Sequence, residues 1–108
     1  MDIKKIDDRF STTGQIRPEQ VEALAAEGYR LIICNRPDGE DAGQPTFAEV
    51  AAAAKQHGMA AKHIPMTGAP TEGQIDAFRE AMKASDGPVL AYCLSGARSQ
   101  KLYAGLND

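Results

Sequence analysis

Short apolar runs alternate with helical segments along this chain of 108 residues, and this alternation limits the folds that it can adopt. The runs at residues 29–34, 60–65 and 89–93 have strand length and a helical apolar pattern follows each of them. Parallel strands need long crossover connections, usually helices. The order therefore predicts an α/β fold with three layers, in which helices flank both faces of a mostly parallel sheet.

Capping signals indicate where four helices begin and end. Pro18 suits a first helical turn, and Gly28 follows as a stop signal. The second and third helices each open with a threonine that precedes Glu or Gln by three residues, the pattern of a capping box. The predicted helices cover residues 18–27, 46–58, 71–86 and 99–106. Before Pro18 the pattern is weaker, and we expect short edge strands at residues 3–6 and 10–13.

The composition suits one ordinary globular domain spanning residues 1–108. The net charge of −3 comes from mixed signs, which argues against partners such as nucleic acid or a membrane surface. The N-terminus lacks the apolar stretch of a signal peptide, and no segment reaches membrane-spanning length. Because the two cysteines each end a buried run, we expect free thiols and a cytoplasmic location.

The segment from Cys93 to Arg98 carries the strongest chemical signal. It connects a predicted strand to a predicted helix, where small and flexible residues let backbone amides converge on an anion. Arg98 adds a planar fork of donors. The predicted anion-binding loop consists of Leu94, Ser95, Gly96, Ala97 and Ser99.

The same surroundings predict that Cys93 is a nucleophile with a pKa below the usual value of about 8.5. Ser95 and Ser99 are placed to donate hydrogen bonds to the thiolate or to a bound anion. The alternative is that Cys93 is a small buried apolar residue. The combination of Cys, Gly, Arg and Ser between a strand and a helix favours the nucleophile.

Ligands of open α/β sheets bind outside the carboxyl ends of the strands, which directs attention to the loops at residues 35–45, 66–70 and 94–98. Three further pocket candidates lie in these loops, and they are Arg36, Asp38 and Thr67. A fourth candidate is Gln15, in a segment at residues 13–15 that lines the far side of the pocket or, alternatively, forms a plain turn. For Arg36 the alternative is a salt bridge to Asp38 or Glu40. Cys34 is a core residue or, alternatively, a resolving thiol for Cys93. No Cys/His cluster indicates a metal, and we expect no cofactor.

The chain resembles a known family in four segments that span nearly its whole length. It is similar to the phosphatase-like domain of beta-lactamase-hydrolase-like bacterial proteins, a sulfurtransferase/phosphatase family. The resemblance implies a dual-specificity-phosphatase-like fold and, as a partner, a fused or co-expressed metallo-hydrolase. The matching segments are STTGQ at residues 11–15, LIICNRPDGE at 31–40, HIPM at 63–66 and PVLAYC with its loop at 88–98.

Loop length separates the two chemistries that the resemblance implies. Phosphatases have five residues between Cys and Arg, whereas this chain has four, the spacing of rhodanese sulfurtransferases. Tyr92 stands where phosphatases usually have histidine, and residues 65–70 lack the acid that protonates a leaving oxygen. Asp38, Glu40 or Asp41 would replace that acid, unless they form a solvated acidic turn.

Three functions remain open on these grounds. The leading hypothesis is a sulfurtransferase that takes sulfur from a small sulfur-containing substrate as a Cys93 persulfide and passes it to a thiol acceptor. The alternative is a phosphatase that acts on a phosphorylated substrate through a phosphocysteine at Cys93. The third is a non-catalytic module that binds an anion or a partner protein.

Overall fold

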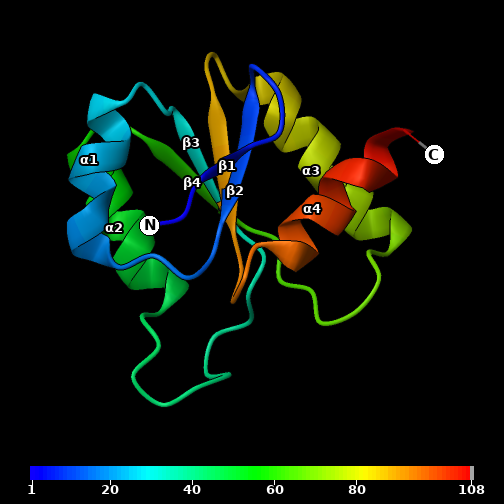
Figure 1. The fold of residues 1–108 in the computed structure, drawn as a ribbon, viewed down its shortest axis with the longest axis horizontal. Coiled ribbons are helices and arrows are strands. Elements are labelled where there is room, and N and C mark those ends of the chain that lie inside the picture. Colours follow the sequence, from blue (N-terminus) through cyan, green and yellow to red (C-terminus); the bar gives the residue numbers. More distant parts are fainter. Residues whose placement is uncertain (108) are drawn as a thin grey trace.

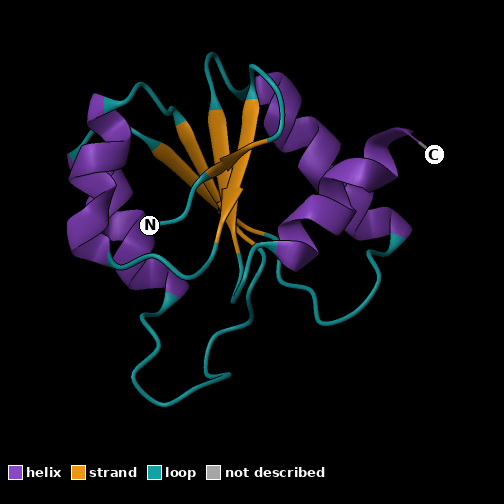
Figure 2. Cartoon of the chain, viewed as in Figure 1, coloured by secondary structure: helices purple, strands orange, loops and turns teal. Residues whose placement is uncertain are grey.

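The computed structural model describes residues 1–107, which form one five-stranded sheet covered by helices on both faces (Figures 1 and 2). The strand order is β1-β2-β5-β3-β4, and every neighbouring pair is parallel except β1 with β2. The strands are β1 (Lys4–Lys5), β2 (Phe10–Thr13), β3 (Leu31–Cys34), β4 (Ala60–His63) and β5 (Val89–Tyr92). The predicted three-layer α/β fold is confirmed.

The helices divide into two pairs, with α1 and α2 on one face of the sheet and α3 and α4 on the other (Figure 1). Both predicted capping boxes are present, at Thr46 and at Thr71. The helices are α1 (Val21–Ala26), α2 (Phe47–Gln56), α3 (Glu72–Ala84) and α4 (Ala97–Ala104), with 3-10 turns at Pro18–Gln20 and Gly105–Asn107. None of the helices within residues 1–107 is long and apolar enough to cross a membrane.

Alternating side chains of the central strands build a separate apolar core on each face of the sheet. In β3, Leu31 and Ile33 join the cluster that packs with Phe78 of α3. Ile32 and Cys34 join the opposite cluster, which contains residues of α1 and α2. Because both faces of the strand are buried, all its residues are apolar, and the sequence shows it as a continuous apolar run.

Residues 10–13 form an interior strand, so the expectation of an edge strand was wrong for this segment. β2 lies between β1 and β5, and all four of its residues are buried. Two of its hydroxyl groups are bonded by distant residues: Tyr29 donates to Ser11 Oγ at 2.9 Å, and Gln100 Nε2 donates to Thr12 Oγ1 at 3.4 Å. These bonds allow polar side chains inside the sheet.

The last helix begins at Ala97, two residues before the predicted start. Gly96 precedes it as the N-cap residue, with a φ of 96°. This left-handed conformation favours glycine and turns the chain sharply after β5. The early start places Arg98 and Ser99 in the first turn of α4, where backbone amides have no partner within the helix.

Candidate active site

Cys93 lies at the bottom of a tight turn between β5 and α4. The residue is 1% exposed, and the amide of Gly96 donates to its Sγ at 3.0 Å. Burial raises the pKa of the thiol, but hydrogen bonds from the backbone amides outweigh burial, and the pKa falls below its ordinary value. The amides that lower it are those of Ser99, Ser95, Arg98 and Gly96.

The turn after β2 supports this loop from the side. Thr13 accepts a hydrogen bond from the amide of Cys93, and the amide of Gln15 donates to the carbonyl of Leu94, both at 3.4 Å. Gly14 lies between them, where a Cβ atom would be 2.8 Å from the carbonyl oxygen of Leu94. Only glycine therefore permits this close approach.

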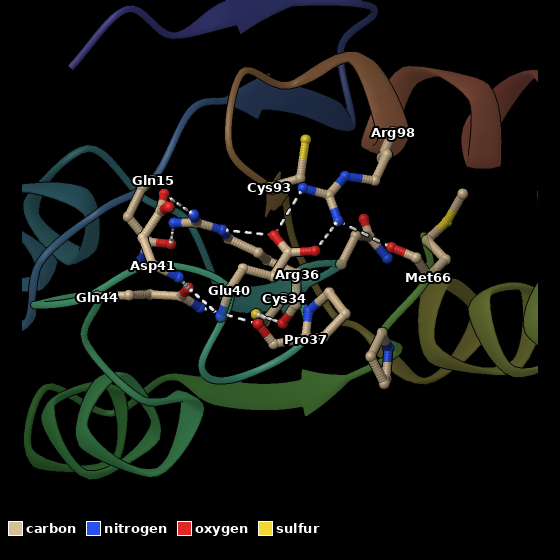
Figure 3. A network of polar contacts seen from close by, with 12 residues as sticks. Gln15, Cys34, Arg36, Pro37, Glu40, Asp41, Gln44, Met66, Cys93 and Arg98 are labelled. Atoms are coloured by element: carbon tan, nitrogen blue, oxygen red, sulfur yellow. Dashed lines mark hydrogen bonds and ion pairs between the residues drawn. The ribbon is translucent and has the colours of Figure 1, made fainter. Parts of the chain in front are cut away.

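Arg98 is held by two acceptors from other loops (Figure 3). Its Nη1 and Nη2 donate to Oε2 and Oε1 of Glu40, each at 2.9 Å, and Nη1 also donates to the carbonyl of Met66 at 2.9 Å. Glu40 and the Cys93 thiolate both raise the pKa of Arg98, Glu40 more strongly. The bonds to Glu40 and Met66 are made by Nη1 and Nη2, and none of them uses Nε. The side chain of Cys93 also hydrogen-bonds with the guanidinium of Arg98.

Glu40 joins Arg98 to a second arginine. Its Oε1 also accepts from Arg36 Nε at 2.8 Å, and the side chain of Arg36 is only 3% exposed. Arg36 further donates to Gln15 Oε1 at 3.0 Å and to Asp41 Oδ2 at 2.5 Å. Hydrogen bonds from Arg98, and secondarily from Arg36, lower the pKa of Glu40 to about 2, so this carboxylate is ionised at neutral pH.

The structure brings together some of the predicted pocket residues and separates others. Gln15 and Arg36 lie in this network, and the salt bridge considered for Arg36 is formed with Glu40. Asp38 instead accepts a hydrogen bond from the amide of Phe47 at 2.8 Å, and thus caps α2. Thr67 is exposed, and the carbonyl of the preceding residue makes the contact to Arg98.

The expectation for the Ser99 hydroxyl was wrong. It donates to Asn35 Oδ1 at 2.8 Å, and it is the backbone amide of Ser99 that acts on the thiol. Asn35 is fully buried and also donates to the carbonyl of Ile64 at 2.9 Å. Sequence reasoning missed Asn35, although a polar residue directly after a buried strand was a usable signal.

Cys34 and Tyr92 lie in the apolar cluster that contains residues of α1 and α2. Burial raises the pKa of the Cys34 thiol, which donates to the carbonyl of Arg36 at 3.2 Å. This placement agrees with a core role for Cys34. Among residues 1–107, no three His, Cys, Asp or Glu side chains gather as metal ligands would.

Residues 2–106 match the family model described as "Beta-lactamase hydrolase-like protein, phosphatase-like domain". The chain belongs to this family. A beta-lactamase hydrolase-like protein of Xylella fastidiosa is 40% identical over 105 residues, which are 96% of this chain and 24% of that protein. The chain therefore spans about a quarter of the length of this curated relative.

Solved structures agree with the family. A candidate phosphatase from Neisseria meningitidis is 33% identical, with a TM-score of 0.89 over 99% of this chain and 77% of that chain. Tk-PTP in its active form is 20% identical, with a TM-score of 0.64 over 87% of this chain and 63% of that chain, which shows the fold alone. The phosphatase-like fold that the resemblance implied is thus confirmed.

Proposed function

We propose that this phosphatase-like domain hydrolyses phosphate monoesters through a phosphocysteine at Cys93. The observation that supports this most is the Nε–Nη2 edge of Arg98, which Glu40 and Met66 leave to the Cys93 site, where backbone amides donate hydrogen bonds to the thiol. An arginine edge holds two phosphoryl oxygens, and inward-pointing amides hold an oxyanion. The family of phosphatase-like domains and the candidate phosphatase from Neisseria support the same chemistry.

The reaction proceeds in two displacements. The Cys93 thiolate attacks phosphorus, the P–S bond forms, and the bond from phosphorus to the leaving oxygen breaks. Water then attacks phosphorus, the P–S bond breaks, and inorganic phosphate leaves while the thiolate is restored. Throughout, Arg98 and the loop amides stabilise the charge on the three equatorial oxygens.

The leaving oxygen receives its proton from water in this proposal. Glu40 is the carboxylate bonded to Arg98, and its pKa of about 2 leaves it without a proton to donate near neutral pH. Aryl phosphates, whose leaving oxygens are stable as anions, are therefore the substrates on which we expect the highest activity.

Sulfur transfer is a second candidate, and the ionised Glu40 is the observation that favours it. The Cys93 thiolate would attack a sulfane sulfur, form a persulfide and release the rest of the donor as an anion. An acceptor thiolate would then attack the outer sulfur and restore Cys93. Neither step needs a carboxylic acid, and the loop has the rhodanese spacing of four residues between Cys93 and Arg98.

A paired assay tests these proposals. We expect phosphate release from p-nitrophenyl phosphate, lost by about 10⁴-fold or more in Cys93→Ser and kept in the matched control Cys34→Ser. Thiocyanate formation from thiosulfate and cyanide, without phosphate release, would overturn the phosphatase in favour of the sulfurtransferase. If the protein shows neither activity, the result would favour the non-catalytic binding module.

A further inference from the structure

We infer that Glu40 and Arg36 are positioning residues that fix the guanidinium of Arg98 in the orientation that binds an oxyanion. The inference rests on the proposed function in one respect, since it concerns the same anion site at Cys93. It goes further by giving a role to a loop far from Cys93 in sequence. Glu40 holds Arg98, and Arg36 holds Glu40.

The geometry of the guanidinium carries the first step. Glu40 binds it end-on, through Nη1 and Nη2, with both distances at 2.9 Å. The carbonyl of Met66 takes the remaining hydrogen of Nη1. The Nε hydrogen and the second Nη2 hydrogen then point along the other edge, a fork that suits two oxygens of one anion.

The second step concerns what keeps Glu40 in place. Arg36 binds Glu40 Oε1 at 2.8 Å, and its buried guanidinium is also bonded to Gln15 from the turn after β2. The backbone carbonyl of Arg36 accepts from Cys34 Sγ at 3.2 Å and contacts His63 Nε2 at 2.9 Å. These contacts hold the backbone of Arg36 against β3 and β4. Because Arg36 binds Glu40, the sheet determines where Glu40 lies.

This arrangement lowers the cost of binding. A free arginine side chain has many rotamers and loses that freedom when it grips a ligand. Here Arg98 is ordered before the anion arrives, by a carboxylate that does not itself take the side-on edge. A network that only stabilised the fold would not need to leave that edge open.

The test uses the whole chain and two readouts. The first is the order of the Arg98 Nε–H group, measured by ¹⁵N relaxation without any ligand. The second is protection of Cys93 from iodoacetamide by inorganic phosphate. In Glu40→Gln we expect Arg98 to become mobile and phosphate protection to weaken by about 10-fold or more, as for other residues that orient a ligand-binding group. Alkylation without phosphate should not slow, because the loop amides remain.

Matched variants separate positioning from general damage. Asp76→Asn removes a carboxylate from a surface ion pair with Arg79, and we expect both readouts to match wild type. Arg36→Lys keeps the charge but loses the planar fork, and we expect an intermediate loss of phosphate protection. In an Arg98→Lys background, Glu40→Gln should cause no further loss.

The outcomes distinguish this inference from the proposed function. The positioning role is wrong if Arg98 stays ordered in Glu40→Gln. It is also wrong if Glu40→Gln weakens phosphate protection as much in the Arg98→Lys background as in wild type. If phosphate fails to protect the wild type while Glu40→Gln releases Arg98, the positioning role holds and phosphate-ester hydrolysis is the proposal that fails.

Discussion

At Cys93 two opposing effects act on one thiol. Burial favours the neutral form, while the amides of the turn favour the thiolate, and the amides prevail. Cys34 is also buried, but there burial is the largest effect, and the pKa of its thiol rises. The two cysteines therefore serve as an internal comparison of how the same side chain responds to different surroundings.

Alkylation should distinguish the two thiols. Since the pKa of Cys93 is lowered, we expect its rate of reaction with iodoacetamide to reach half its plateau at a pH below about 8.5. Lowering the pH through the pKa protonates the thiolate and slows the reaction. Cys34 should react only after unfolding, so native Cys93→Ser should be inert. An inflection at or above pH 8.5 would contradict the prediction.

Local sequence was enough to predict that Cys93 and Arg98 lie in one site, because both belong to one short strand-to-helix connection. It did not suffice for Asn35 or Glu40, whose partners Ser99 and Arg98 lie 64 and 58 residues away. A candidate such as Asp38 looked equivalent to Glu40 in sequence. Only the path of the loop shows that one caps a helix and the other binds an arginine.

At the scale of elements, the turn that contains Cys93 depends on the turn that follows β2. The two segments touch through backbone atoms, with Gly14 pressed against the carbonyl of Leu94. Sequence patterns predicted the helices well because their caps are local, as at Thr46 and Thr71. They misplaced β2 because its interior position depends on pairing with both β1 and β5, which the local sequence pattern does not show.

Gly14→Ala should therefore damage both stability and the site. The added Cβ would be 2.8 Å from a backbone oxygen, so one of the two turns must shift. We expect a loss of about 1–3 kcal/mol in the free energy of unfolding, measured in urea, with reduced phosphate protection of Cys93. Gly68→Ala is the matched control, since its Cβ would meet nothing within 4 Å. Equal stability of the two variants would refute the steric argument.

At the scale of the whole molecule, parallel strands deliver four loops to one edge of the sheet. The turn after β2 supplies Gln15, the loops after β3 and β4 supply Glu40 and the Met66 carbonyl, and the turn after β5 supplies Cys93. The sheet order places β5 between β2 and β3, so Cys93 lies between the segments that support its turn. The fold thus explains why segments far apart in sequence form one site.

Because Glu40 ties several of these segments together, its ionisation should affect the stability of the entire fold. Its pKa is lowered from 4.5 to about 2, so the unfolded chain binds its proton at a higher pH than the native protein does. The stabilisation is fully present above pH 4.5 and is lost as the pH falls towards 2. Glu40→Gln lacks this contribution at every pH. We therefore expect wild type to be more stable than the variant in urea at pH 7, with a gap that narrows from pH 4.5 downward. A gap that stays constant down to pH 3 would mean that Glu40 stabilises the protein through its shape and hydrogen bonds rather than its charge.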